Sequence, residues 1–141
     1  RGHFSDRSDY RLHGYFDETA ALGMAANVIT GCVDAAATAQ AVTEYCRSNP
    51  VDAILARSDK VACIAMQAIM DMGRRVPEDI AVVGFDNSSL SQYVRPTLTS
   101  IEIQRDRIGK TAVAMLDQML NGGGVPASQE FRTRLIRRES A

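Results

Sequence analysis

The sequence has few of the residue types on which metal sites and nucleophilic catalysis depend. It contains no tryptophan, two histidines and three cysteines among 141 residues. Both histidines, His3 and His13, lie near the start, and the cysteines (Cys32, Cys46 and Cys63) are far apart and set among apolar residues. Because no CxxC pair and no His/Cys cluster is present, we expect no metal and no cofactor. We expect the cysteines to be buried, reduced thiols.

Sequence motifs of catalysis are also absent. The patterns GxSxG and GxGxxG and the P-loop do not occur. The glycine run within residues 121–124 follows a predicted helix, where it ends the helix, whereas a phosphate-binding loop would precede one. We therefore predict that the chain is not an enzyme.

Neither the charge nor the hydropathy pattern indicates nucleic acid or a membrane as a direct partner. The formal net charge is -1, and the single basic cluster, near the C-terminus, is short. No apolar run approaches the roughly 20 residues of a membrane-spanning helix, and no signal segment opens the chain. We expect a cytoplasmic protein without membrane contact. Because the first residue is not methionine, we also expect that the chain is truncated at its N-terminus.

Strand patterns and helix patterns alternate along the chain. Helical spacing of apolar residues predicts helices over residues 8–22, 34–48, 60–72 and 104–121, with one helical turn before Pro96. Short apolar or alternating runs predict strands over residues 27–30, 51–56, 80–85, 98–103 and 130–138. This alternation is typical of the α/β class, with a doubly wound, mostly parallel sheet and helices on both faces.

Polar side chains follow three of the predicted strands. Val33 and Asp34 come after the first strand, Ser58 and Asp59 after the second, and Asp86 after the third. Ligands of such sheets bind beyond the carboxyl ends of the strands. We therefore expect these residues to meet at one edge of the sheet.

Each candidate residue also has an ordinary structural explanation. The Asp86 carboxylate can accept hydrogen bonds from ligand hydroxyls, but aspartate is equally favoured as a cap of the turn "DNSS". Arg11 can hold ligand oxygens with its planar guanidinium, or it can be a solvated helix arginine. Ser58 or Asp59 can contact a ligand, although capping of the following helix already accounts for one of them.

The helix predicted at residues 60–72 is apolar around most of its circumference. Such a helix is either buried between layers or in contact with a second subunit. We favour the subunit contact.

Four segments between residues 50 and 121 occur in a recognisable order and spacing. They are an "SD" helix start, "RVPEDIAVVGFD", "PTLTS" and "IGKTAVAML". Together they resemble the effector-binding region of the lactose-repressor and galactose-repressor family of bacterial transcription regulators. The segment "RSDYRLHGYFDE" extends a weaker resemblance to nearly the whole chain.

The resemblance implies the type I periplasmic-binding-protein fold, in which two α/β subdomains surround a cleft. It assigns residues 1–97 to most of the C-terminal subdomain and residues 98–121 to a crossover segment and helix of the N-terminal subdomain. Residues 122–141 would form a returning strand and tail. The DNA-binding helix-turn-helix, the hinge and most of the N-terminal subdomain would lie outside this sequence.

The resemblance also implies site residues. Arg11 and Asp86 match the ligand-contacting arginine and aspartate of the family. Ser58 matches a polar ligand position, Asp59 the aspartate beside it, and Arg7 a second, more variable position in the cleft.

Two positions depart from the pattern of the family. Val33 stands where many members place an aromatic residue that stacks on the ligand, so this contact is in doubt. Ile103 replaces a frequent glutamine. We include Val33 among the candidate ligand-binding residues, and both departures leave the identity of the ligand open.

The leading hypothesis is a non-enzymatic domain that senses a small molecule, with a carbohydrate as the favoured class, for a cytoplasmic repressor. The resemblance implies a homodimer formed through the helix at 59–72 and the region of Tyr93, with DNA bound only through a helix-turn-helix outside this sequence. The alternative is a periplasmic sugar-binding protein of a transporter, which shares the fold. The segment "RVPEDIAVVGFD" and the three cysteines favour the regulator, and an enzyme on the same kind of sheet has no motif in its support.

Overall fold

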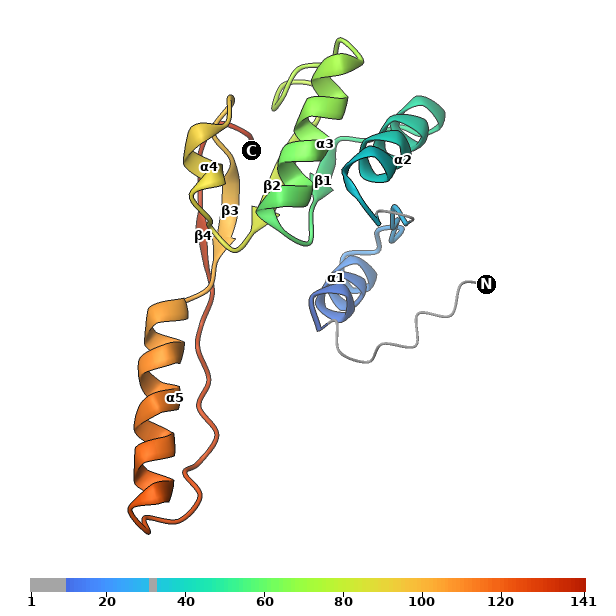
Figure 1. Cartoon of the computed structure of the whole chain (residues 1–141). Coiled ribbons are helices and arrows are strands. Elements are labelled where there is room, and N and C mark those ends of the chain that lie inside the picture. The colour runs from blue at the N-terminus through green and yellow to red at the C-terminus, as the bar shows by residue number, and fades with distance from the viewer. Residues whose placement is uncertain (1–9, 31–32) are drawn as a thin grey trace.

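The computed structural model describes residues 10–30 and 33–141, which form a four-stranded sheet with helices beside it (Figure 1). The strands are β1 (Ala53–Leu55), β2 (Ala81–Phe85), β3 (Thr99–Glu102) and β4 (Arg134–Ile136). The helices are α1 (Tyr10–Ala21), α2 (Ala35–Ser48), α3 (Asp59–Asp71), α4 (Leu90–Tyr93) and α5 (Arg105–Leu120).

The sheet is mostly parallel. Its order is β1-β2-β3-β4, in which β1–β2 and β2–β3 are parallel and β3–β4 is antiparallel. The carboxyl ends of the first three strands therefore lie along one edge, where ligands of such sheets bind. The predicted α/β class and the mostly parallel sheet are confirmed.

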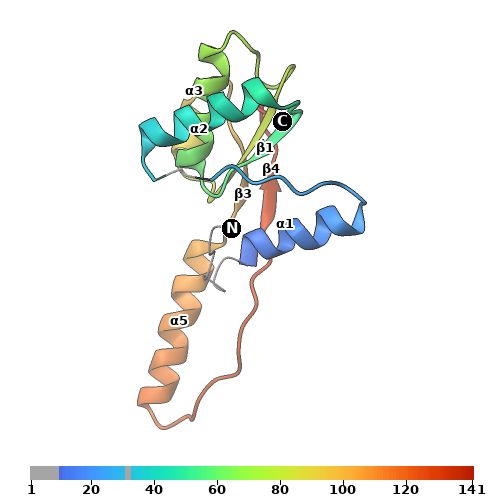
Figure 2. The ribbon, with the colours of Figure 1, turned by 90° about the vertical axis from the view of Figure 1, so that its right-hand side faces the viewer.

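Helix α3 lies at the centre of the core. It packs against α2, β2 and α4, and α2 and α3 lie on the same side of the sheet (Figure 2). The buried apolar residues of α3 are Ala62, Ala65, Met66, Ala68 and Ile69. Packing between layers accounts for much of the apolar circumference of this helix. The subunit contact that we favoured as the explanation stays a prediction.

Side-chain caps start α2 and α3, and the cap at Ser58 is one that the sequence predicts. Asp34 Oδ1 accepts a hydrogen bond from Ala37 N at 2.8 Å, and Ser58 Oγ accepts one from Val61 N at 3.4 Å. Gly23 follows α1 with a φ of 67°, a conformation that glycine adopts without steric cost. These local signals therefore fix the predicted ends of three elements.

The prediction of a strand at residues 27–30 is wrong. These residues lie outside the sheet, in which β1 is an edge strand. The Tyr15 hydroxyl donates a hydrogen bond to Asn27 O at 3.1 Å and accepts one from Asn27 N at 3.0 Å. A side chain of α1 thus satisfies main-chain groups that a neighbouring strand would otherwise bind.

The last strand is shorter than the predicted range of 130–138. β4 pairs with β3 over residues 134–136 only, and the chain before it runs beside α5 (Figure 1). Leu135 is exposed, whereas Ile136 is half-buried. The first two residues of β4 are both exposed, so burial does not alternate along this short strand.

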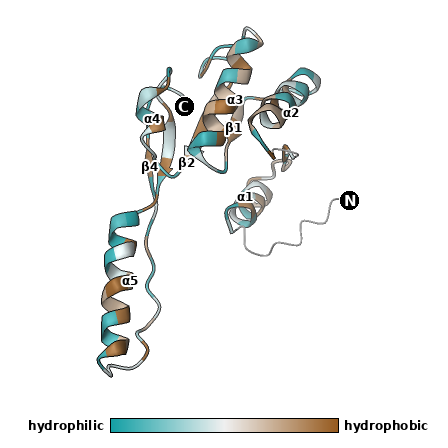
Figure 3. Ribbon diagram, in the orientation of Figure 1, coloured by the Kyte–Doolittle hydropathy of each residue, from teal (hydrophilic) through white to brown (hydrophobic). Residues whose placement is uncertain are grey.

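Helix α5 projects away from the sheet and buries none of its residues (Figure 1). Its apolar positions, which Figure 3 shows in brown, include the exposed Ile108, Val113, Leu116 and Leu120. The assignment of residues 98–121 to a second subdomain stays a prediction. Neither α5 nor any other helix in the described part of the chain is long and apolar enough to cross a bilayer.

Two of the cysteines are free thiols in or beside the core, and Cys32 lies outside the described residues. Cys46 is buried and Cys63 is half-buried. Burial raises the pKa of both thiols, and the Asp59 carboxylate raises the pKa of Cys63 further. Both thiols are therefore protonated and poorly nucleophilic at neutral pH.

Gly84 in β2 lies directly against the first turn of α3. A Cβ atom at this position would overlap the Asp59 carboxylate and would lie 2.9 Å from Leu98 Cδ2. The close approach of helix and strand therefore requires glycine here.

The substitution Gly84→Ala is expected to lower the free energy of unfolding of the intact protein by about 1–3 kcal/mol, because the added methyl group is overpacked. Urea unfolding measures this loss. Gly109→Ala on α5 is the matched control, since a Cβ there has open space around it and alanine favours a helix. Equal unfolding midpoints for Gly84→Ala and the unsubstituted protein would contradict the close approach.

Candidate functional site

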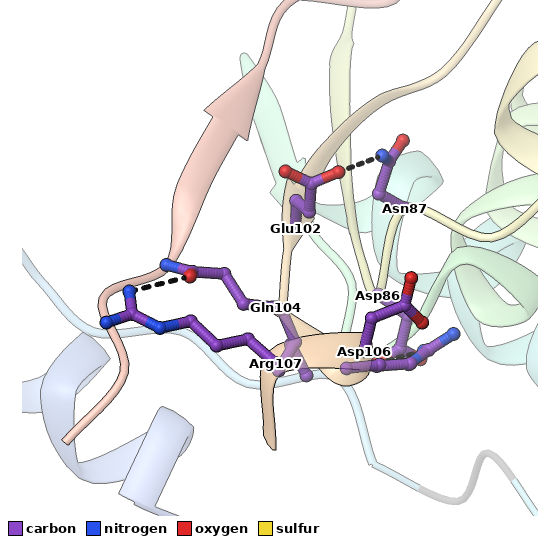
Figure 4. A pocket seen from close by; sticks show the side chains of 8 residues that line it. Asp86, Asn87, Glu102, Gln104, Asp106 and Arg107 are labelled. Carbon is purple, nitrogen blue, oxygen red and sulfur yellow. Dashed lines mark hydrogen bonds and ion pairs between the residues drawn. The ribbon is translucent and has the colours of Figure 1, made fainter. Parts of the chain in front are cut away.

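Two pockets lie at the carboxyl edge of the sheet. The Asp86 pocket, of about 340 Å³, is lined by Asp86, Asn87, Glu102, Ile103, Gln104, Arg105, Asp106 and Arg107 (Figure 4). The Ser58 pocket, of about 170 Å³, is lined by Val33, Asp34, Ala35, Thr38, Arg57, Ser58, Lys60, Val61 and Ile64. The predicted site residues are thus divided between two neighbouring strand ends.

Asp86 enters its pocket from a strained backbone position. Its φ is 108°, and that of Asn87 is 47°. A positive φ costs a residue other than glycine about 1–3 kcal/mol and persists only where its surroundings impose it. Asp86 Oδ1 lies 3.1 Å from Arg105 Nη2, and the aspartate side chain is 29% exposed. The carboxylate is therefore partly buried at the pocket and paired with the start of α5.

Other residues cap the turn that follows Asp86. Asn87 N donates a hydrogen bond to Ser100 Oγ at 3.0 Å, and Ser88 N donates one to Asp59 Oδ2 at 2.5 Å. The structural explanation that we considered for Asp86, a cap of this turn, therefore belongs to Ser100 and Asp59. The Asp86 carboxylate lies against Arg105 instead.

Asp59 supports the site from behind. It is 2% exposed, and its Oδ1 accepts a hydrogen bond from Ser100 Oγ while its Oδ2 accepts the one from Ser88 N. One carboxylate thus ties the start of α3 to β3 and to the loop between β2 and α4. With both oxygens engaged, the structure gives Asp59 a supporting position, and the ligand contact predicted for it is untested.

Arg11 reaches the same edge of the sheet from α1. Its Nη1 donates a hydrogen bond to Arg57 O at 2.9 Å, and its guanidinium carbon lies 5.2 Å from the centre of the Phe85 ring. Arg57 follows β1, and Phe85 is the last residue of β2. The structure therefore places Arg11 beside the ends of both strands. The two residues that it contacts, Arg57 and Phe85, directly precede Ser58 and Asp86 in the sequence.

The remaining predicted residues are less informative. Val33 and Ser58 line the Ser58 pocket, and Val33 is 87% exposed at its mouth. Ser58 Oγ accepts the capping bond of α3, which confirms the structural explanation for one of the paired residues Ser58 and Asp59. Arg7 lies outside the described residues.

Sequence reasoning missed Arg105. The rule that selected Asp86, a position just beyond the carboxyl end of a parallel strand, applies equally to β3 and would have indicated residues 103–105. Ile103 lines the same pocket, and Gln104 Oε1 accepts a hydrogen bond from Arg107 Nη1 at 3.3 Å (Figure 4). The end of β3 thus contributes as much to the pocket as the end of β2.

This arrangement is suited to hydrogen bonding with a polar ligand. A carboxylate accepts hydrogen bonds and a guanidinium donates them, so Asp86 and Arg11 can bind ligand hydroxyls. Within residues 10–30 and 33–141, no group of three or more His, Cys, Asp or Glu residues is placed to hold a metal ion. The mostly parallel sheet and the pockets at its carboxyl edge define an α/β domain with a candidate ligand site at the ends of its strands.

Comparison with known proteins agrees with this class. A family model of the periplasmic binding protein-like domain matches residues 2–141. The chain therefore belongs to the periplasmic binding protein-like domain family, and the relatives that it resembles are transcription regulators of the LacI family. The resemblance inferred from the sequence is confirmed.

The relatives in sequence are transcription regulators. The HTH-type transcriptional regulator AscG of Escherichia coli K12 is 34% identical over 140 residues, which are 96% of this chain and 42% of AscG. The HTH-type transcriptional repressor PurR of Escherichia fergusonii is 42% identical over 89 residues, which are 62% of this chain and 26% of PurR.

Solved structures of LacI-family regulators share the fold. The crystal structure of Escherichia coli AscG has a TM-score of 0.83 at 34% identity, covering 93% of this chain and 49% of that one. A regulator of Arthrobacter sp. FB24 in complex with lactose has a TM-score of 0.79 at 34% identity, covering 89% and 49% of the two chains. The CelR–cellobiose complex has a TM-score of 0.80 at 32% identity, covering 93% and 42%. The present chain therefore spans less than half the length of these relatives.

The hydrogen bonds of Asp59 and the ion pair between Arg105 and Asp86 are expected to differ in their contribution to stability. Asp59→Asn leaves either Ser88 N or Ser100 Oγ facing an amide group that cannot accept its hydrogen bond, so we expect a loss of about 1–3 kcal/mol in the free energy of unfolding. Arg105→Gln removes only a partly exposed ion pair and is expected to change the free energy of unfolding by less than about 1 kcal/mol. Urea unfolding of the intact protein compares the two, and a larger loss for Arg105→Gln would contradict the assignment of Asp59 as the supporting residue.

Proposed function

We propose that this domain binds a small-molecule effector, with a sugar as the favoured class, in a transcription regulator of the LacI family. The observation that carries the proposal is the Asp86 carboxylate at the edge of the sheet, held by a strained backbone and not engaged in capping its own turn. Two structural relatives are complexes with lactose and with cellobiose. A disaccharide offers the vicinal hydroxyls that a carboxylate binds well.

In this proposal Asp86 and Arg11 orient the ligand between the ends of β1, β2 and β3. Asp86 accepts hydrogen bonds from ligand hydroxyls, and Arg11 donates hydrogen bonds to ligand oxygens. Val33 provides a small apolar surface at the mouth of the Ser58 pocket in place of an aromatic ring. Selectivity then depends more on hydrogen bonding than on ring stacking.

The ion pair of Asp86 with Arg105 connects ligand binding to the position of α5. A ligand that donates hydrogen bonds to Asp86 competes with Arg105, which is the first residue of that helix. A ligand shifts a conformational equilibrium only by its difference in affinity for the two states. We propose that this competition contributes to that difference in a non-enzymatic, cytoplasmic regulator, with operator binding located outside these 141 residues.

Asp86→Ala is expected to weaken binding of the effector by at least about tenfold, because a charge-assisted hydrogen bond is lost. A thermal-shift screen of the intact regulator with lactose, cellobiose, other sugars and purines identifies the ligand, since a ligand of the native state raises the unfolding temperature. Asp17→Ala, an exposed aspartate of α1, is the control. A normal effector response in the Asp86→Ala variant would refute the proposed site.

We also propose that the regulator is a homodimer that uses α3 and the region of Tyr93. Tyr93 is 79% exposed on α4, which packs against α3, and Leu90 on the same helix is exposed. One structural relative is a lac repressor dimer bound to its operator. A large exposed tyrosine beside an apolar helix is typical of an interface position.

Tyr93→Asp is expected to shift the intact regulator toward monomer, because it places a charge in the proposed interface. Tyr10→Asp is the matched control, since Tyr10 is 80% exposed but lies on α1. Sedimentation velocity at several protein concentrations measures the distribution. An equal effect of the two substitutions, or no effect of either, would argue against this interface.

A further inference from the structure

The loop that carries Asp86 is held from the far side by a residue close to the end of the chain. Arg138 Nη2 donates a hydrogen bond to Asn87 Oδ1 at 2.6 Å, and Arg138 Nη1 donates one to Leu98 O at 2.6 Å. The main-chain N of Arg138 donates to Thr99 Oγ1 at 2.8 Å. The guanidinium is therefore anchored at the start of β3 and reaches Asn87 from a fixed position.

Asn87 is bound through its main-chain N and through both polar atoms of its side chain, and its Oδ1 also accepts a hydrogen bond from Ser91 Oγ at 3.3 Å. Its main-chain N donates to Ser100 Oγ at 3.0 Å, its Nδ2 donates to Glu102 Oε1 at 2.9 Å (Figure 4), and its Oδ1 accepts from Arg138. Its φ of 47° lies in the left-handed region, which asparagine tolerates better than most residues. The conformation of Asn87 is thus imposed by its neighbours on β3 and near the C-terminus.

Fixing Asn87 also fixes the residue before it. Asp86 has a φ of 108°, a costly value for a residue with a side chain, and the backbone would relax if the next residue were released. Relaxation would move the Asp86 carboxylate relative to its pocket. Arg138 is not among the residues that line this pocket, and its connection to the pocket runs through Asn87, which does line it.

We propose that Asn87 and Arg138 are positioning residues for effector binding. They hold the backbone of Asp86 in the conformation that presents its carboxylate to the ligand. This proposal rests on the proposed role of Asp86 as a ligand-binding group. It gives the residues after β4 a function in the binding site that their distance in sequence does not indicate.

Hydrogen–deuterium exchange of the intact regulator without ligand tests the positioning directly. Arg138→Met keeps an unbranched, flexible side chain but removes both hydrogen bonds of the guanidinium. The amides of residues 86–88 are then expected to exchange about tenfold faster, while the amides of α3 keep their rates. Ser88→Ala is the matched control from the same loop, because Ser88 Oγ has no hydrogen-bond partner among the described residues. Unchanged exchange at 86–88, or an equal increase throughout α3, would overturn the proposal.

A double-mutant cycle separates positioning from a general loss of stability. With cellobiose as the probe, we expect Arg138→Met to weaken binding about five- to tenfold when Asp86 is present and less than about twofold in the Asp86→Asn background. Arg138→Lys keeps one donor group, so its cellobiose affinity is expected to lie between that of the unsubstituted regulator and that of Arg138→Met. Equal losses in both backgrounds would overturn the proposal. If the unsubstituted regulator does not bind cellobiose, that result counts against cellobiose as the effector and does not bear on Arg138. The exchange rates of residues 86–88 then decide whether Arg138 positions Asp86.

Discussion

The buried carboxylate of Asp59 is the interaction on which the rest of the domain depends. It lies in the first turn of α3, where the helix dipole favours a negative charge, and it accepts hydrogen bonds from Ser100 on β3 and from Ser88 in the loop after β2. A buried charge is costly unless it is fully hydrogen-bonded, and here both oxygens have partners. Gly84 provides the space for this contact, so strand, helix and loop are joined at one point.

The geometry of the candidate site follows from that contact. Because Asp59 and Ser100 take the amides of the turn, the Asp86 carboxylate is released from capping and faces its pocket. Asn87 transmits the restraint to Asp86, whose backbone would not keep its conformation unaided. The site thus has a rigid side on the sheet and a second side formed by Arg105 at the start of α5, a helix that buries none of its residues. Such a division between a fixed and a separate part suits a domain that responds to its ligand.

Local signals in the sequence predict much of this structure, and the remainder depends on tertiary contacts. Helical spacing, the caps and the order of strands and helices are properties of short segments, so the mostly parallel sheet and the position of Asp86 follow from them. The strand expected at residues 27–30 fails because a strand needs a neighbour, and its main chain is bound by Tyr15. The residues around Asp59 in the sequence do not indicate whether its carboxylate points into the core or toward solvent, so its supporting role could not be predicted. Only Gly84, a glycine inside an apolar strand, signals the close approach, and no local pattern joins Asn87 to Arg138.

The central claim is that Asp86 binds the effector while Asp59 holds the loop behind it. The most direct measurement is a crystal structure of the intact regulator with the sugar that stabilises it. The account predicts sugar hydroxyls within about 3 Å of the Asp86 carboxylate and of the Arg11 guanidinium, with Asp59 still bound to Ser88 and Ser100. A sugar hydrogen-bonded to Asp59, or bound elsewhere while Asp86 keeps its ion pair with the start of α5, would contradict it.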